Sequence, residues 1–469
     1  MSVPVISVEQ MRAWEKATWQ TGQTEDEVIY LVGKALAARA LELTTPGQGI
    51  VLLAGKGHNG DDARAACEHI LDRRVDLMEV ESPGADLVDL QAALRQKPAL
   101  LIDALFGIGL NRPLDDDWQK FIATVNASGV PILAVDVPSG LNAETGQPFG
   151  AAVEATITLT VGAPKAGLLA SGAERYVGHL EVAHDVGLIP CQETSEHAWT
   201  LPQDFLRFPP PRPASSHKGS FGHLAIIAGS VGYHGAAVLA TRGAQRARPG
   251  LITLFTHEPA YHAIAPQLQS AMVRPWRAAD KIATDYNAVL LGPGLASPDV
   301  ADDLKLSGRK LWRDAALPVV ADASALDWLP LEPVPRNTIR VLTPHPGEAG
   351  RLLKCSAAQV QQNRTHALRE ISKRFGHCWV VLKGNHTLIG RSTGEVYVNG
   401  SGNPYLAQGG SGDLLAGFIA GLLVQPPLQA DVAQTLRYAV WQHGAAADAL
   451  QSRRRNWTVE DLAGEIGNA

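Results

Sequence analysis

Short, almost continuously apolar segments recur along both halves of this chain, and each ends in glycine or a polar residue. Sequences with helical periodicity lie between them. A strand that is apolar on both faces must be covered on both faces, as happens in a parallel sheet flanked by helices. The pattern therefore predicts an α/β fold. The expected strands cover residues 49–55, 98–107, 130–140, 223–229, 251–256, 288–294, 317–324, 339–348 and 378–384, and the expected helices include 62–71 and 118–127.

A proline-rich segment separates the two alternations. Prolines at 209–211 and at 213 exclude a helix or a central strand there and favour a stiff, extended connector. A length of 469 residues also allows two or three domains, each with its own core. We therefore expect two domains, at residues 1–210 and 215–469.

Composition excludes several classes of protein. The formal net charge of −6 offers no basic excess for nucleic acid. The four cysteines show no CxxC spacing, so neither a zinc site nor a disulfide framework is indicated. No apolar stretch approaches the roughly 20 residues that span a bilayer, and the N-terminus has no signal-peptide pattern. We expect a cytoplasmic protein with no nucleic-acid or membrane partner.

The segment GNPYLAQGGSGD, at 402–413, carries the strongest chemical signal. Its glycines allow the backbone N–H groups to converge just before an apolar segment that is expected to be helical, which makes an anion site. A carboxylate beside bound phosphate is costly unless it accepts a proton, so Asp413 is the candidate base for a hydroxyl that attacks a phosphoryl group. This is kinase-type chemistry without a Walker sequence.

Three further clusters accompany this loop in the second half. A glycine-bearing turn within 217–240 precedes a helix expected to start near Ala236, and TPHPGE places His345 between two prolines. LKGNHT ends a strand with Lys383 and Thr387, which suit phosphate groups. Structural alternatives exist for each residue: a helix N-cap for Asp413, a turn cap for His345, a solvated strand end for Lys383 and turn geometry alone for Gly294.

Together these motifs resemble the ADP-dependent NAD(P)HX dehydratases of the ribokinase-like superfamily, over residues 215–465. The resemblance implies that ADP (or ATP) with Mg²⁺ phosphorylates the hydroxyl of (S)-NAD(P)HX, and that loss of phosphate regenerates NAD(P)H. Asp413 would be the catalytic base. The implied hydrate contacts are Ala236, Gly294, His345 and Asp413, and the implied nucleotide contacts are Lys383, Gly384, Asn385, His386, Thr387 and Gly412.

The first half resembles the NAD(P)HX epimerase domain, a Rossmann-like fold, through GKGHNGDDA, DALFGIGLNRPL, VDVPSGLNAETG and TLTVGAPKAGLL. The resemblance implies K⁺ held by Asn59, Asp103 and Ser139. Oxygen ligands of this kind suit a hard cation. Capping of a turn is the better explanation for Asp103 or Asp136 alone, whereas the pair together with Asn59 favours the site. Asp136 and the segment 107–113, beginning Gly107, Ile108 and Gly109, would contact the hydrate, and Lys165 belongs to the family's PK pair.

The first loop departs from that family, which usually reads close to GNNGGDG. His58, Asp61 and Ala63 replace an asparagine and two glycines, and Asp61 would place negative charge where a phosphate-bearing cofactor should lie. Tyr30 and Leu31 stand where polar residues are usual. These changes predict an epimerase half that is degenerate or weakened.

Metabolite repair is thus the expected function, in a homo-oligomer as the family implies. One alternative is a ribokinase-like vitamin kinase with a non-catalytic N-terminal domain, which would release a stable phosphorylated product. Another is a non-catalytic nucleotide-binding scaffold, which the intact Asp413 disfavours for the second half.

Overall fold

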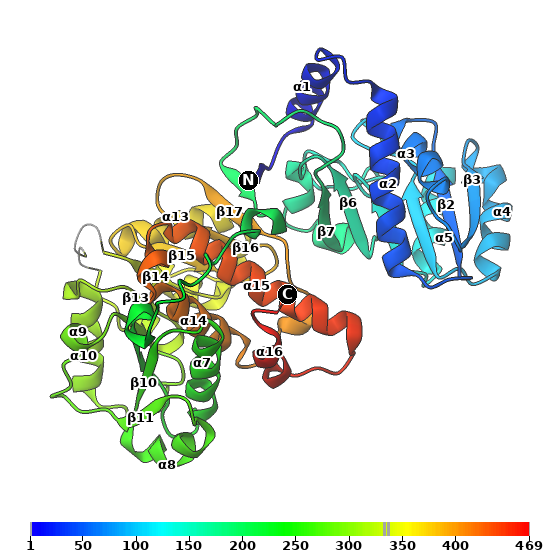
Figure 1. Ribbon diagram of the computed structural model, residues 1–469. Coiled ribbons are helices and arrows are strands. Elements are labelled where there is room, and N and C mark those ends of the chain that lie inside the picture. The colour runs from blue at the N-terminus through cyan, green and yellow to red at the C-terminus, as the bar shows by residue number, and fades with distance from the viewer. Residues whose placement is uncertain (1, 332–333, 335–337, 469) are drawn as a thin grey trace. The chain divides into compact units, whose positions relative to one another are not determined.

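The computed structural model describes residues 2–331, 334 and 338–468, and the chain divides into two compact units between Trp199 and Thr200 (Figure 1). This boundary lies about ten residues before the one predicted from the prolines. The intervening residues belong to the second unit, because Phe205 lies in its core and Asp204 forms an ion pair with Arg437. The prolines therefore follow the boundary instead of forming it.

The first unit contains a six-stranded parallel sheet in the order β3-β2-β4-β5-β6-β7. The strands of the sheet are β2 (Gly49–Ala54), β3 (Arg74–Glu79), β4 (Leu100–Ala104), β5 (Ile132–Val135), β6 (Ile157–Val161) and β7 (His179–Ala183), and β1 (Val3–Pro4) pairs with β8 (His197–Trp199). The helices are α1 (Val8–Trp19), α2 (Glu25–Leu43), α3 (His58–Cys67), α4 (Pro83–Arg95), α5 (Asp116–Ala127) and α6 (Glu174–Val177).

Successive residues of β2 pack on opposite faces of this sheet. Ile50 and Leu52 join a core with α2 and α3, whereas Val51 and Leu53 join a second core with α4 and α5. The predicted Rossmann-like, three-layer α/β/α arrangement is confirmed. The strand order reverses between β2 and β4, so their following loops diverge there and leave a crevice at the carboxyl ends of the strands.

The second unit has its own sheet, in the order β11-β10-β9-β12-β13-β14-β15-β16-β17. Neighbours from β11 to β15 are parallel, and β16 and β17 are antiparallel additions. The strands are β9 (His223–Ile227), β10 (Leu251–Thr256), β11 (Met272–Pro275), β12 (Ala288–Leu291), β13 (Val319–Ala321), β14 (Arg340–Leu342), β15 (Trp379–Leu382), β16 (Thr387–Gly390) and β17 (Val396–Asn399). The helices are α7 (His234–Arg246), α8 (Tyr261–Ile264), α9 (Ile282–Asp285), α10 (Asp302–Asp314), α11 (Pro346–Leu353), α12 (Ala357–Gln362), α13 (Arg364–Arg374), α14 (Ser411–Leu423), α15 (Val432–Arg453) and α16 (Val459–Glu465).

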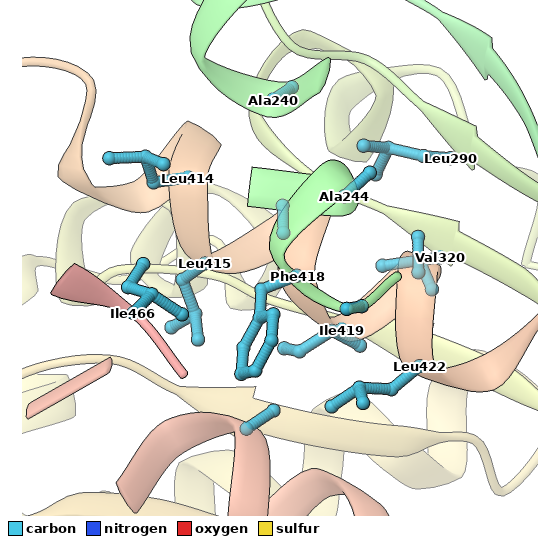
Figure 2. Packing of buried hydrophobic residues seen from close by; sticks show 14 of the residues in the cluster. Ala240, Ala244, Leu290, Val320, Leu414, Leu415, Phe418, Ile419, Leu422 and Ile466 are labelled. Atoms are coloured by element: carbon cyan, nitrogen blue, oxygen red, sulfur yellow. The ribbon is translucent and has the colours of Figure 1, made fainter. Parts of the chain in front are cut away.

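Helices α7 and α14 lie against each other in the core of this unit (Figure 2). Ala240 and Ala244 of α7 face the apolar side chains of α14. The backbones touch, because a Cβ on Gly243 would lie 2.1 Å from the carbonyl oxygen of Leu414, and one on Gly417 would lie 1.9 Å from that of Ala240. Glycine at these two positions therefore sets how closely the helices approach.

Within the part of the chain that the structure describes, no helix is both long and apolar enough to cross a membrane.

Candidate functional site

Asp413 is the third residue of α14, and the helix begins directly after Gly410, whose φ is +97°. Gly410 is the N-cap residue, and no side chain caps the helix. The capping alternative for Asp413 is therefore excluded. The first N–H groups of α14 are left without intrahelical acceptors, as an anion site at this helix end would require, and binding of an anion there stays a prediction.

A buried charge network lies beside this helix end. The Lys383 ammonium is 2.9 Å from Asp322 Oδ1 and 3.9 Å from Glu348 Oε2. Thr343 Oγ1 donates to the same Asp322 oxygen at 2.6 Å. A Cβ on Gly412 would lie 3.2 Å from Lys383 Nζ, so the helix end rests close to the ammonium group. Lys383 is thus not a solvated strand end.

Burial raises the pKa of Asp413 to about 7, with further contributions from Asp322 and Glu348 that Lys383 opposes. A carboxyl group with a pKa near neutrality can both take and release a proton at working pH, which a general base requires. Burial alone would lower the pKa of Lys383, but Asp322 and Glu348 raise it above its ordinary value. Lys383 therefore remains a cation.

His345 is the N-cap residue of α11, and its Nδ1 accepts a hydrogen bond from the Gly347 N–H at 3.0 Å. The structural alternative for this residue is confirmed. With Nδ1 used as an acceptor, a neutral ring carries its proton on Nε2, and that atom lies 3.5 Å from Glu348 Oε1. The side chain is half exposed, so a contact with the hydrate stays a prediction.

Gly294 and Ala236 meet at the point where the strand order reverses between β9 and β12. Gly294 has a φ of +65°, and a Cβ there would lie 2.4 Å from the Tyr233 carbonyl oxygen and 2.9 Å from Ala236 Cβ. Glycine is thus required by both the turn and the close approach. The structure brings the two predicted hydrate contacts together.

The predicted nucleotide-binding residues lie at two places in this unit. Gly412 lies in the first turn of α14, and Lys383 to Thr387 form the connection from β15 together with the first residue of β16. In that connection, which is called the 383–387 loop below, Gly384 and Asn385 are exposed and Thr387 Oγ1 donates to the Gly384 carbonyl at 3.0 Å.

The first unit holds a cavity of about 1010 Å³ at the carboxyl ends of β2 and β4. The predicted hydrate contacts Gly107, Ile108, Gly109 and Asp136 all line it. This is the switch point of the sheet, where ligands of such folds bind. The structure therefore places these residues where a ligand fits, and their roles stay predictions.

The three predicted K⁺ ligands are linked through hydrogen bonds beside this cavity. The Ser139 N–H donates to Asp103 Oδ2 at 2.8 Å, the Phe106 N–H donates to Ser139 Oγ at 2.9 Å, and Asn59 Nδ2 donates to the Phe106 carbonyl at 3.1 Å. A Cβ on Gly107 would lie 2.4 Å from Asn59 Oδ1. Burial raises the pKa of Asp103 to about 6, although Ser139 opposes the rise. These oxygens suit a hard cation.

Asp136 forms a buried ion pair with Lys165, whose Nζ lies 2.5 Å from Asp136 Oδ1. The same oxygen accepts hydrogen bonds from Thr160 Oγ1 at 3.1 Å and from the Val161 N–H at 3.0 Å. Asp136 has a φ of +61°, so it occupies the strained left-handed region. Capping of a turn by Asp136 would not require a buried cation, so the capping alternative does not explain the ion pair with Lys165.

Asp62 also lines the cavity, yet sequence reasoning gave it no role. It is 7% exposed, and among the described residues no hydrogen bond or ion pair involves its carboxyl group. Burial raises the pKa of Asp62 well above its ordinary value, and Asp136, Asp61 and Glu15 add to the rise. The only feature of the sequence that pointed to Asp62 was its place in the GKGHNGDDA motif.

Comparison with known proteins identifies the family. The NAD(P)H-hydrate dehydratase family model matches residues 224–467, and the model of the YjeF-related protein N-terminus matches residues 77–167. The bifunctional NAD(P)H-hydrate repair enzyme Nnr of Gloeobacter violaceus is 35% identical over 492 residues, covering 96% of this chain and 94% of that protein. The chain belongs to this family. The same enzyme of Coxiella burnetii is 34% identical and covers 97% of this chain and 96% of that protein.

A solved structure supports the fold of the second unit. A ribokinase-like superfamily protein from Enterococcus faecalis, 23% identical, aligns with a TM-score of 0.51 over 60% of this chain and 97% of its own. The predicted ribokinase-like fold is confirmed.

Two of the three departures in the family's first loop, Asp61 and Ala63, lie outside the cavity lining. Helix α3 already begins at His58, and Asp61 points to Arg64, 2.8 Å away, outside the cavity lining. Ala63 is fully buried in the core beside α2, and its helical conformation needs no glycine. The Asp61 side chain is thus not where the sequence placed it, although its charge still contributes to the raised pKa of Asp62 in the cavity.

The remaining departures are Tyr30, Leu31 and His58, of which His58 alone lines the cavity. Tyr30 is half exposed and packs edge-on against His69, and Leu31 packs on the core. Neither residue lines the cavity. His58 does reach its rim, where its Nε2 lies 3.0 Å from Glu25. Of these departures, His58 alone lies at the cavity, and a degenerate or weakened epimerase half stays a prediction.

Sequence reasoning also missed residues of the second unit. Asp322 lies in the expected strand segment 317–324, and Glu348 is the last residue of TPHPGE. In sequence, each is recognisable only as an acidic residue at a strand end or in a turn. His443 gave no signal: it is buried on α15, and its Nε2 lies 3.1 Å from the Ser411 carbonyl oxygen. Burial lowers the pKa of His443 to about 4. A neutral imidazole therefore supports the first turn of α14.

Proposed function

We propose that the chain repairs hydrated nicotinamide cofactors in two steps, one in each unit. The first unit interconverts (R)- and (S)-NAD(P)HX, and the second dehydrates the (S)-form to NAD(P)H with ADP or ATP as phosphoryl donor. One observation carries the proposal: the carboxyl group of Asp413, whose pKa partial burial raises to about 7, lies at the N-terminus of a helix that no side chain of the described residues caps. Family membership favours this reaction over a vitamin kinase.

In the second unit, the oxygen of the hydrate's ring hydroxyl attacks the terminal phosphoryl group of the nucleotide, and Asp413 takes the proton of that hydroxyl. The free N–H groups of α14 and the cation Lys383 receive the phosphate oxygens. Loss of inorganic phosphate, together with a proton from the neighbouring ring carbon, restores the double bond. These roles follow from the position of each group beside the helix end.

Mg²⁺ would neutralise charge on the nucleotide phosphates. Among the described residues there is no cluster of three His, Cys, Asp or Glu that could hold it. Mg²⁺ commonly uses one or two carboxylates together with substrate phosphates. Lys383 lies closer to Asp322, at 2.9 Å, than to Glu348, at 3.9 Å, and Glu348 Oε2 also accepts a hydrogen bond from the His345 N–H. Either carboxylate would have to exchange a protein partner for Mg²⁺.

In the first unit, Asn59, Asp103 and Ser139 would hold K⁺, which supplies positive charge beside the bound cofactor. Epimerisation exchanges the hydroxyl on the carbon next to the ring nitrogen. A departing hydroxyl needs a proton, and the water that enters from the other face must lose one. Asp62 and Asp136 line the cavity and can serve as this acid and base.

The test supplies the full chain with mixed (R)- and (S)-NADHX, ADP, Mg²⁺ and K⁺, and follows the return of NADH absorbance. Complete conversion, faster than the epimers interchange unaided, is expected. Asp413→Asn should lose at least a hundredfold in rate while it keeps its affinity for ADP. Asp62→Asn should give a fast phase that stops when the (S)-epimer is spent.

The Asp61→Ala variant is the matched control, because Asp61 pairs with Arg64 outside the cavity lining. It should still convert both epimers, with a shifted pH dependence because Asp61 contributes to the raised pKa of Asp62. A wild type that stops at the (S)-epimer would refute the epimerase half. Release of a stable phosphorylated product without NADH would favour the kinase alternative.

We also propose a cytoplasmic homo-oligomer without nucleic-acid or membrane partners, as composition and family resemblance imply. Light scattering of the purified chain tests the oligomeric state.

A further inference from the structure

One arginine outside the predicted site binds the main chain of the 383–387 loop. Arg364 is the first residue of α13. Its Nη2 donates to the carbonyl oxygens of Leu382, at 3.0 Å, and Lys383, at 3.4 Å. Its Nη1 donates to those of His386, at 3.1 Å, and Asn385. One guanidinium thus collects four carbonyl groups from the end of β15 and the loop.

The backbone of the loop is unusual in a way that this contact explains. Gly384 has a φ of +139° and His386 a φ of +50°, both in the region that side chains disfavour. A Cβ on Gly384 would lie 3.1 Å from Arg364 Nη2, so the glycine leaves room for the guanidinium. Turning the carbonyls toward one cation offsets the cost of these conformations, because hydrogen bonds to a charged donor are strong.

The opposite side of the loop is free to bind an anion. Gly384 and Asn385 are exposed, and among the described residues their N–H groups have no acceptor. Backbone N–H groups left free in this way make an anion-binding surface. The positive charge of Arg364 on the carbonyl side adds to the attraction, and Lys383 begins the same loop.

We propose that Arg364 is a positioning residue for the nucleotide: it fixes the 383–387 loop in the conformation whose free N–H groups receive the phosphates of a nucleoside diphosphate. The inference rests on the proposed function of the second unit. Arg364 itself touches neither nucleotide nor hydrate, and it acts through the loop.

The chain offers a matched control on the same helix. Arg369 also binds loop carbonyls, with Nη1 2.9 Å from that of Arg391 and Nη2 2.7 Å from that of Gly394. These carbonyls follow β16, at the other end of the strand from the 383–387 loop. Replacing either arginine by glutamine removes one guanidinium group from α13, together with its hydrogen bonds to main-chain carbonyl groups.

The experiment measures the Kd and KM for ADP, kcat and Tm of the full-length wild type, Arg364→Gln, Arg364→Lys and Arg369→Gln. Arg364→Gln should raise the Kd and KM for ADP about tenfold, as the loss of charge-assisted hydrogen bonds predicts, while kcat changes less than threefold. Arg364→Lys should recover part of the affinity because it restores the charge. Arg369→Gln should stay within twofold of the wild type.

An unchanged Kd for ADP in Arg364→Gln would overturn the inference, as would an equal loss in Arg369→Gln. If Arg364→Gln does not fold, Gly384→Ala tests the same contact from the loop, since its Cβ displaces the guanidinium. Full ADP affinity in that variant would also overturn the inference. A wild type that neither binds ADP nor returns NADH would instead refute the proposed function.

Discussion

Neutralising Asp413 should make the nucleotide-free protein more stable, by an amount that grows with pH. Burial raises the pKa of this carboxyl group from 3.8 to about 7 in the folded state. Below pH 3.8 the group is protonated in both states and has no differential effect. Between pH 3.8 and about 7 the unfolded chain ionises first, which favours unfolding. Above pH 7 the whole cost applies.

The magnitude follows from the shift in pKa. A difference of one in pKa corresponds to about 1.4 kcal/mol, so the ionised carboxylate costs the folded state about 4 kcal/mol above pH 7 and about 2 kcal/mol at pH 5. Asp413→Asn removes this cost. The difference in free energy of unfolding between the variant and the wild type should therefore increase by about 2 kcal/mol from pH 5 to pH 8.

Urea denaturation at several pH values measures this difference for the transition of the second unit. Asp431→Asn is the matched control, because it exchanges one good N-cap residue for another at the exposed start of α15. A difference for Asp413→Asn that stays constant between pH 5 and pH 8 would refute the reasoning. The same variant should lack dehydratase activity, so stability and catalysis would change in opposite directions.

Two further substitutions test the buried charges. Lys165→Met should destabilise the first unit by roughly 3–5 kcal/mol because it strands the Asp136 carboxylate in the interior, and adding Asp136→Asn should recover part of the loss; urea denaturation that shows no loss in the single variant would contradict the ion pair. Burial lowers the pKa of His443 to about 4, so the free energy of unfolding of the wild type should fall by about 3 kcal/mol relative to His443→Gln as pH falls from 6.5 to 4. The variant should lack this pH dependence. Parallel pH profiles of unfolding free energy would speak against that assignment.

Strand ends were predictable because apolar runs and the polar residues after them are properties of consecutive sequence. The carboxyl ends of parallel strands meet at one edge of a sheet, which is why Asn59, Asp103 and Ser139 come together as expected. Asp322 was overlooked for the converse reason. An isolated aspartate after a strand is common, and only the strand order shows that Lys383 lies opposite it.

The error at Asp61 arose from helical phase. The segment was treated as a loop before a helix at residue 62, whereas α3 begins at His58. On a helix, neighbouring residues point about 100° apart, so Asp62 enters the cavity while Asp61 turns to Arg64. The onset of a helix without a side-chain cap leaves little trace in sequence, and the same is true of the contact between His443 and Ser411.

The contact between α7 and α14 sets the distance between two residues of the candidate dehydratase site. Ala236 belongs to one helix and Asp413 to the other, and main chain touches main chain at Gly243 and Gly417. Their separation is therefore fixed by backbone atoms, which no side-chain replacement in the surrounding core can lengthen or shorten. We expect a methyl group at either glycine to push the helices apart and to move Asp413, the proposed base, relative to Ala236.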